Sequence, residues 1–443
     1  MRLMTAVLLA LVLSTMVCAD DWPQWRGPNR DGISAEKDLM ATWPPKKVWS
    51  FEAGLGYSAV SVSNGRAYVM GNVKREGDRG IDTVFCLDAA DGKVLWKHRY
   101  ECTTSKSDKQ AAYSGPRATP VVDGDVVYTV SLEGWLFCLG AADGKVRWFQ
   151  ELNKYAFEDL SGLLYGYCST PVVYEDKLFC YVNGALMAFE KKTGKPIWRC
   201  KGGRPLWNGS SPIIAELGGK ICAVFGEEEL VGADVATGDK VWSHVIGRTA
   251  VIAPVVMGDK VFYSSYPNRG ACGVFQVNAE NGTTTALWAS REIQIYHAGN
   301  PVLKDGCLYS LDAARTEYLT RDKKVSSLKC IDFETGKVKW KQKKMGWAQL
   351  ILADDKLFIL REEGELVVVQ ASPEEYKELG RAKLAEGVYW AGPALADGRL
   401  YCRSNSGTVT CLKVSKSSEG DQAPAPANAG KAQPKPEKTE KDG

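Results

Sequence analysis

The residues of this chain that could do chemistry are few and scattered. Its three histidines, His98, His244 and His297, stand far apart in the sequence and do not indicate a histidine-rich metal centre. None of the 13 cysteines is adjacent to another, and no C-x-x-C-H segment is present for covalent haem. No G-x-S-x-G sequence marks a nucleophilic serine. The sequence therefore predicts neither catalytic residues nor a metal site.

Aromatic and polar side chains recur, by contrast, where predicted inner strands begin. Tryptophan, tyrosine and arginine are the residue types enriched at binding hot spots. We therefore predict that a ligand or a partner protein binds to the following residues: Tyr113, Arg117, Tyr167, Trp207, Asn208, His297, Asn300, Trp347, Tyr389 and Trp390. The alternative is that these rings fill a channel and that His297 is an ordinary hydrogen-bonded histidine.

A sequence repeat defines the strands that must position these residues. Its clearest copies are CLDAADGKVLW (86–96), CLGAADGKVRW (138–148), MAFEKKTGKPIW (187–198), GADVATGDKVW (232–242) and CIDFETGKVKW (330–340). The tryptophans that anchor the repeats, 44 to 52 residues apart, are Trp49, Trp96, Trp148, Trp198, Trp242, Trp288 and Trp340. Short apolar runs separated by turn pairs such as Asp-Gly indicate four strands in each unit. Units of this length and composition are typical of propeller blades.

Eight inner strands are expected, so the sequence predicts an all-β, eight-bladed β-propeller of four-stranded antiparallel blades. The seventh unit ends in RAKLA (381–385), where no tryptophan stands. The eighth, from Tyr389 to about Ser415, shows only three strands. We expect the N-terminal strand around Trp49 to supply the fourth, because closing the ring removes an exposed sheet edge.

The pattern [A/C]-L-D-x-x-[T/D]-G-K-x-x-W resembles the tryptophan-docking repeat of quinoprotein alcohol dehydrogenases and their PQQ-like propeller relatives, from about Val48 to Ser415. The opening DDWPQWRGPNRDGIS (20–34) also resembles that of exported PQQ-like repeat proteins. The resemblance implies that each tryptophan packs between neighbouring blades. In function, the chain is similar to the non-catalytic propeller scaffold of the outer-membrane β-barrel assembly machinery.

The resemblance leaves two alternative functions. One is a PQQ-dependent dehydrogenase that oxidises an alcohol or a sugar and uses PQQ with Ca²⁺. The family pattern for that activity includes adjacent cysteines and a carboxylate–amide Ca²⁺ site, and neither is matched here. The other is a carbohydrate- or peptide-binding propeller. We therefore expect a binding protein without a cofactor or a metal, whose partner is an envelope protein or a small ligand at the channel mouth.

Residues 1–19 are typical of a signal peptide cleaved after Ala19, which predicts a periplasmic or secreted protein. Lipid attachment at Cys18 is the less favoured alternative, because Met16 and Val17 fit a lipobox poorly. A lead segment (20–46), the propeller (47–416) and a disordered Pro/Ala/Lys-rich tail (417–443) are expected to follow.

The balanced charge of the chain bears on the classes of partner that it is expected to bind. A formal net charge of +3 with no basic cluster predicts no nucleic-acid partner, and no later apolar run predicts a membrane span. The chain is expected to be monomeric. The sequence leaves open whether Cys402 and Cys411, which flank a predicted turn, form a disulfide.

Overall fold

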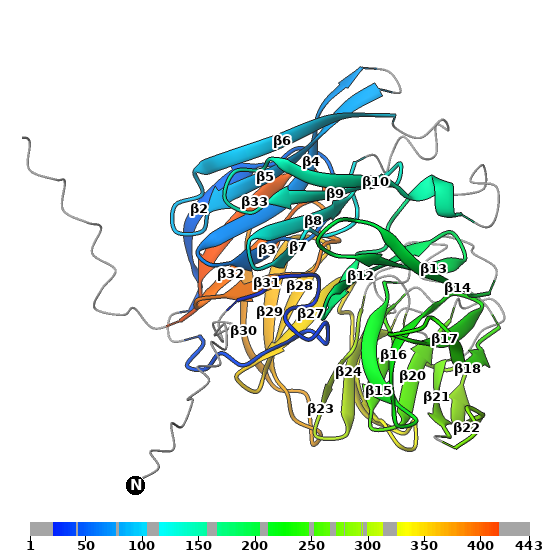
Figure 1. Cartoon of the computed structure of the whole chain (residues 1–443). Coiled ribbons are helices and arrows are strands. Elements are labelled where there is room, and N and C mark those ends of the chain that lie inside the picture. The colour runs from blue at the N-terminus through cyan, green and yellow to red at the C-terminus, as the bar shows by residue number, and fades with distance from the viewer. Residues whose placement is uncertain are drawn as a thin grey trace, which may run out of the picture.

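The computed structural model describes residues 21–40, 43–76, 79–103, 115–156, 166–203, 211–247, 252–265, 272–278, 280–293, 295, 299–312 and 326–415. Eight sheets follow one another around the molecule, as Figure 1 shows. The four strands that build each blade are antiparallel, and in blades 1 to 7 they follow chain order from the inside outward. This arrangement confirms the predicted all-β, eight-bladed propeller.

Blade 1 contains β3 (Ser61–Ser63), β4 (Arg66–Glu76), β5 (Arg79–Asp88) and β6 (Val94–Thr103). Blade 2 contains β7 (Val121–Asp123), β8 (Val126–Val130), β9 (Trp135–Gly140) and β10 (Val146–Glu151), followed by the short 3-10 helix η1 (Leu152–Tyr155). Blade 3 contains β11 (Val172–Tyr174), β12 (Lys177–Val182), β13 (Ala185–Glu190) and β14 (Pro196–Lys201). Blade 4 contains β15 (Ile213–Leu217), β16 (Lys220–Gly226), β17 (Glu229–Asp234) and β18 (Lys240–Val245).

Blade 5 contains β19 (Val255–Met257), β20 (Lys260–Ser264), β21 (Cys272–Val277) and β22 (Thr284–Ser290). Blade 6 contains β23 (Val302–Lys304), β24 (Cys307–Asp312), β25 (Ser327–Asp332) and β26 (Val338–Lys343). Blade 7 contains β27 (Ala348–Ala353), β28 (Lys356–Arg361), β29 (Glu365–Gln370) and β30 (Glu378–Lys383). Blade 8 contains β31 (Ala394–Ala396), β32 (Arg399–Arg403) and β33 (Thr408–Lys413), with β2 (Lys46–Glu52) as its outer strand.

The N-terminal strand closes the ring as predicted. Strand β2 pairs with β33, and Trp49 lies opposite Cys411. One blade differs from the predicted four strands: the two-residue strand β1 (Ile33–Ser34) pairs in parallel with β27 and makes blade 7 five-stranded. It does so because the lead segment runs along the inner edge of that blade.

The anchoring tryptophans contact the following blade through one recurring geometry. The indole N–H of Trp96 in blade 1 donates to the carbonyl of Ala141 in blade 2, at 2.8 Å. The ring faces Gly144, where an added Cβ would lie 2.4 Å from it. The same pair of contacts joins Trp49 to Ala89 and Gly92, Trp148 to Lys191 and Gly194, and Trp288 to Phe333 and Gly336. The turn glycine therefore allows the left-handed backbone and also the close approach of the indole.

Blade 7 lacks this tryptophan and receives one from elsewhere. In blade 6, Trp340 lies opposite Cys330, and the equivalent pair in blade 7 is Gly380 with Val368. Gly380 thus occupies the anchor position. The ring of Trp43, from the lead segment, lies over it, since a Cβ on Gly380 would come within 2.6 Å of that ring. A distant residue fills the space that the repeat leaves empty here.

The twelve cysteines of the described residues are all free thiols. Strand register explains why Cys402 and Cys411 do not form a disulfide. Cys402 lies opposite Thr410 and Cys411 lies opposite Tyr401, so the two side chains point to opposite faces of the sheet.

Candidate binding site on the propeller axis

The lead segment lies across one end of the ring and contacts six blades. Trp22 pairs with Val62 in blade 1, and the Pro23 carbonyl accepts from Val122 in blade 2. The remaining contacts reach Pro171 in blade 3, Pro301 in blade 6, Leu352 in blade 7 and Gly398 in blade 8. Residues of the lead segment therefore join blades that are far apart in the sequence.

Two buried arginines of the lead segment hold it in place. Arg26 donates to the carbonyls of Arg30, Asp31 and Pro301, and Arg30 donates to those of Thr170 and Pro171. Burial lowers the pKa of Arg26 to about 10 and that of Arg30 to about 9. Among the described residues neither makes an ion pair with a carboxylate. Backbone carbonyl oxygens, and not directly bonded carboxylates, therefore hold these two guanidinium groups within the described residues.

A third buried arginine has the same character near the other end. Arg403 donates to the carbonyls of Ser58 and Gly54, at 2.8 and 3.0 Å. Its side chain is only 1% exposed, and burial lowers its pKa to about 9. Three buried guanidinium groups, each held by backbone carbonyl oxygens, therefore lie close to the axis.

A cavity of about 150 Å³ lies on the axis above the lead segment. Trp25 lines it, and the guanidinium carbons of Arg26 and Arg30 lie 5.8 and 5.6 Å from the Trp25 ring centroid. The other lining residues come from the ends of inner strands: Tyr57, Ala59, Arg117, Thr119, Cys168, Thr170, Ser211, Asn300, Gln349, Trp390, Ala391 and Gly392.

A belt of hydrogen bonds fixes the wall of this cavity. The Thr119 hydroxyl accepts from the backbone N–H of Ala59, and the Thr170 hydroxyl accepts from that of Thr119, each at 3.1 Å. The Ser211 hydroxyl continues the series at 3.0 Å from the Thr170 nitrogen. On the far side, the Asn300 side chain accepts from Ala253 at 3.3 Å. These bonds join blades 1 to 4 in series and blade 5 to blade 6.

Stacked cationic and aromatic groups form the rim. The guanidinium of Arg117 lies 4.4 Å from the centroid of the Tyr57 ring, within cation–π distance. Tyr57 lies 5.7 Å from Trp390, and Trp390 lies 6.1 Å from Trp347. The indole N–H of Trp390 donates to Glu362 at 2.8 Å, which fixes its orientation. The rim thus presents one cation beside three adjacent rings.

The structure brings part of the predicted site together. Arg117, Asn300 and Trp390 line the cavity, and Trp347 extends the rim. Tyr167 and Tyr389 are buried and lie away from it: Tyr167 donates to Asn153, and Tyr389 lies against Gly364. Tyr113, Trp207, Asn208 and His297 lie outside the described residues.

Sequence reasoning missed Trp25, Tyr57 and the belt. A signal for the belt was present, because a residue followed by proline recurs at its level: Thr119-Pro120, Thr170-Pro171, Ser211-Pro212, Ala253-Pro254, Asn300-Pro301 and Gly392-Pro393. No local pattern indicates that Trp25 returns to the axis, since its partners there are distant in the sequence.

The cavity does not suit the quinone cofactor that the fold implies. PQQ is a three-ring tricarboxylate, and pockets for molecules of that size are roughly 300–1,000 Å³, whereas this one is about 150 Å³. No Asp or Glu is among the described residues lining it, so it offers no carboxylate to Ca²⁺. Burial raises the pKa of Cys168 to about 11, which keeps the thiol protonated at neutral pH.

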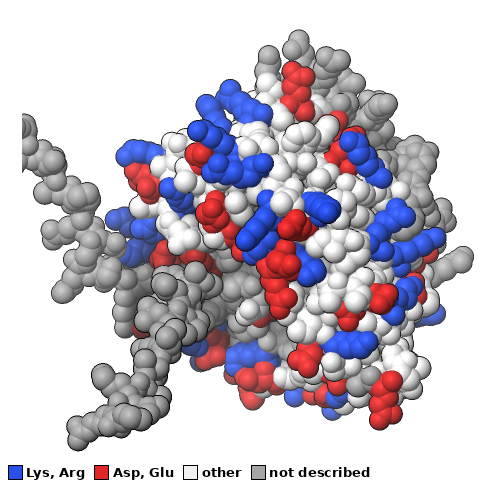
Figure 2. Space-filling view, viewed as in Figure 1, with Lys and Arg blue, Asp and Glu red and all other residues white. Residues whose placement is uncertain are grey.

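The described residues show no other ligand set of the kinds sought. No three His, Cys, Asp or Glu side chains within them gather as metal ligands would. In the same part of the chain, no helix has the length and apolar character needed to cross a membrane. Basic and acidic side chains are interspersed on the face shown in Figure 2.

Eight blades, their recurring tryptophan contacts and an axial cavity define a PQQ-like β-propeller. A model of the protein family described as outer membrane protein assembly factor BamB matches residues 80–342. The chain belongs to this family.

Relatives and solved structures extend the match. The BamB protein of Yersinia pestis is 23% identical over 311 residues, which cover 66% of this chain and 71% of that protein. The crystal structure of BamB from Moraxella catarrhalis has a TM-score of 0.58 at 16% identity, covering 84% of this chain and 98% of that one. Quinohemoprotein alcohol dehydrogenase from Comamonas testosteroni has a TM-score of 0.61 at 15% identity, covering 90% and 81%. At these identities the structures show the fold alone.

Proposed function

We propose that this protein is an exported, non-catalytic scaffold of the cell envelope that binds a protein partner through the rim of its axial cavity. The observation that carries the proposal is the rim itself, where Arg117 stacks on Tyr57 and Tyr57 lies beside Trp390. Arginine, tyrosine and tryptophan in contact at a concave end are the composition of a binding hot spot. Among the described residues, the lead segment contacts the inner parts of several blades, and its Trp25 lines the same cavity as the rim residues Tyr57, Arg117 and Trp390.

The charge on the axis defines the partner's chemistry. Arg26, Arg30 and Arg403 are buried with carbonyl acceptors, and Arg117 stands at the rim. Hydroxyl and amide groups line the cavity between them. An acidic side chain or a terminal carboxylate of the partner would meet guanidinium and hydroxyl groups there. A cavity of about 150 Å³ holds one such group and not a large cofactor.

Two further observations support the envelope setting. The family is described as an outer membrane protein assembly factor. Residues 1–19 have the sequence of a signal peptide, with an apolar stretch that ends in Val17-Cys18-Ala19.

The test of the proposal compares rim variants in a defined complex. Partners would be captured from envelope extract with the mature chain, identified by mass spectrometry, purified, and titrated by calorimetry. We expect Arg117→Ala and Trp347→Ala each to weaken binding at least tenfold while the melting temperature stays within a few degrees. Arg147→Ala is the matched control, since Arg147 lies exposed on the outer strand of blade 2. Equal affinity in both rim variants would contradict the proposal.

The dehydrogenase alternative has its own measurement. The protein would be incubated with PQQ and Ca²⁺ and scanned for a bound quinone spectrum and for oxidation of alcohols and sugars. We expect neither, because the cavity is too small and carries no carboxylate in its described lining. Oxidation of an alcohol or a sugar by the PQQ-loaded protein would show that the protein is an enzyme and would contradict the scaffold proposal.

A further inference from the structure

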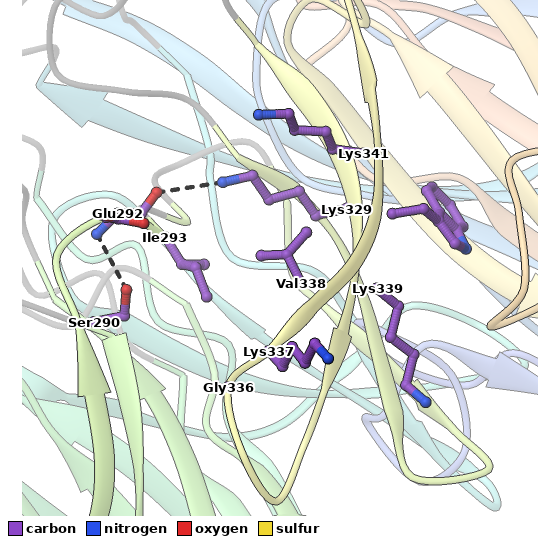
Figure 3. Close-up of a pocket in the computed structure, with 10 residues that line it drawn as sticks. Ser290, Glu292, Ile293, Lys329, Gly336, Lys337, Val338, Lys339 and Lys341 are labelled. Atoms are coloured by element: carbon purple, nitrogen blue, oxygen red, sulfur yellow. Dashed lines mark hydrogen bonds between the residues drawn. The ribbon is translucent and has the colours of Figure 1, made fainter.

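A larger cavity lies away from the axis, in the groove between blades 5 and 6. Its volume is about 730 Å³, within the roughly 300–1,000 Å³ of small-molecule pockets. Ser290, Glu292 and Ile293 form the blade 5 side, and Lys329 with the hairpin from Gly336 to Lys341 forms the blade 6 side. Figure 3 shows Ile293 and Val338 in the middle of this groove, with the lysines arranged around them. Apolar residues, four lysines and one acidic residue, Glu292, therefore share one cavity.

Lys329 is a charged residue at a position that the repeat keeps uncharged. In blade 6 it lies opposite the residue that follows the anchoring tryptophan, Lys341. The equivalent positions of the other blades hold Phe85, Phe137, Met187, Val231, Gly273, Val367 and Thr410. The other seven blades thus show that the fold does not require a lysine here.

The charge of Lys329 is buried together with a partner. Its side chain and that of Asp312 are each 11% exposed, and the two form an ion pair. The Lys329 ammonium also donates to the backbone carbonyl of Glu292 at 3.3 Å. A buried ion pair adds little stability relative to apolar residues of the same size. Its presence at the inner end of a cavity is therefore better explained by a ligand than by folding.

Lys341 supplies a second ammonium group to the same groove. It is exposed and makes no ion pair with any described residue. Like charges that lie directly opposite each other destabilise a sheet, so the Lys329–Lys341 pair requires negative charge nearby. Asp312 neutralises one charge and leaves the other for a ligand.

We propose that this groove binds a compact anion on an apolar stem, a phosphate or a carboxylate carried by an alkyl chain. The anionic group lies between the ammonium groups of Lys341 and Lys329, and the stem lies over Ile293 and Val338. Ammonium groups bind such anions as point charges. The site is separate from the axial cavity and does not depend on the partner proposed there.

Lysines on an edge strand have a simpler use, which is to prevent pairing with another chain. Lys339 and Lys343, exposed on the outer strand β26, suit that use. Lys329 does not, because it lies on the third strand of the blade, β25, and is buried. The burial of Lys329 therefore distinguishes a binding groove from edge protection.

The test uses octyl phosphate with the mature protein, measured by isothermal calorimetry below the micelle concentration. We expect one binding site, and at least tenfold weaker binding in Lys341→Gln. Lys97→Gln is the matched control, because Lys97 follows Trp96 in blade 1 as Lys341 follows Trp340 in blade 6. Wild-type affinity in Lys341→Gln, or an equal loss in Lys97→Gln, would overturn the proposal.

A second variant removes the buried pair without leaving an unpaired charge. Lys329→Met with Asp312→Leu replaces both partners by apolar residues, a change that proteins tolerate. We expect this variant to melt like the wild type and to lose octyl phosphate binding. A folded variant with unchanged affinity would show that Lys329 does not contact the ligand.

Three further probes separate the stem from the anionic group and identify the source. Inorganic phosphate alone should bind at least tenfold more weakly than octyl phosphate, and equal binding would refute the role of Ile293 and Val338. Octanoate tests the carboxylate form. Vesicles containing phosphatidylglycerol should retain the wild type more than Lys341→Gln if the natural ligand is a lipid headgroup. If the vesicles retain neither the wild type nor Lys341→Gln while the wild type still binds octyl phosphate, the natural ligand is a soluble molecule.

Discussion

The seam between blades 1 and 2 and the seam between blades 7 and 8 are packed with residues from different parts of the chain. In the first, Trp96 comes from the repeat and lies against Gly144 of the next blade. In the second, the repeat has Gly380 at the anchor position, and Trp43 from the lead segment lies over it. Trp43 also packs against the core cluster of blades 7, 8 and 1. The ring thus requires an indole near each of these seams, whichever segment supplies it.

Removing the lead segment with the closing strand should have the largest effect. Deletion of residues 20–53 takes away Trp43, both buried arginines and strand β2. Blade 8 then has an open edge, and open edges pair with other chains. We expect aggregates in size-exclusion chromatography. Deletion of 417–443 is the control and should leave the melting temperature unchanged. A monomeric, folded 20–53 deletion would contradict the closure.

Replacing single tryptophans by alanine should show how much each seam contributes to the free energy of unfolding. Trp96→Ala removes an 8% exposed ring and its hydrogen bond, which should lower the free energy of unfolding by about 3–5 kcal/mol. Trp340→Ala should act similarly through its bond to Ser372. Trp43 is partly buried, as Trp340 is, but its indole N–H has no hydrogen bond within the described residues, so Trp43→Ala should lower the free energy less. Urea unfolding followed by circular dichroism gives the values. If all three variants unfolded like the wild type, the proposed packing role of these tryptophan rings would be wrong.

Moving the tryptophan back into the repeat would sharpen the comparison. Gly380→Trp alone should destabilise the protein, because the Trp43 ring already fills that space. In the background of Trp43→Ala the same change should restore stability. A double-mutant cycle should therefore show a favourable coupling of at least about 1 kcal/mol. Additive effects would mean that the two positions do not share one site.

Changing the pH should have the smallest effect on the free energy of unfolding. It should distinguish the axis, which carries charged groups, from the seams, which do not. Burial raises the pKa of Asp31, which lies beside Arg26 in the lead segment. The folded state then binds the Asp31 proton more tightly than the unfolded state. Its stabilising contribution is complete below the unfolded pKa of about 3.9 and is lost as the pH rises through the raised folded value.

The control for this titration is Asp31→Asn, which keeps an oxygen to accept from the Ile33 N–H, as Asp31 does at 2.9 Å. The stability difference between wild type and variant should fall as the pH rises from about 3.9. A difference that does not change with pH would show that Asp31 titrates alike in both states. The pH profile of Trp96→Ala should parallel that of the wild type.

The repeat made the ring predictable. The anchors from Trp49 to Trp340 and the Asp-Gly turns are local signals, and strands of one blade are neighbours in the sequence. Those signals predicted the eight blades and the closure by β2. The fifth strand of blade 7 was not predicted, because its two residues pair with Leu352 and Ala353, more than 300 positions away.

The axial site was predicted only in part, because some of its residues have local sequence signals and others depend on long-range contacts. Arg117, Asn300 and Trp390 precede or begin inner strands, so the fold itself brings them to the axis. Trp25 and the two arginines beside it reach the axis through carbonyl oxygens of other blades, and a carbonyl has no sequence signature. Lys329 could have been found by aligning the repeats, since it is the charged exception at its position.

The long reach of the lead segment has a consequence for the order of folding. Arg26 hydrogen-bonds to a residue 275 positions later, and Glu36 to one 362 positions later. Arg26 and Glu36 therefore cannot reach these partners until blades 6 and 8 exist. Contacts of such sequence separation form slowly, because the intervening chain must be ordered first. A chain truncated before blade 6 would therefore leave Arg26 without the carbonyl of Pro301 and Trp43 without Gly380.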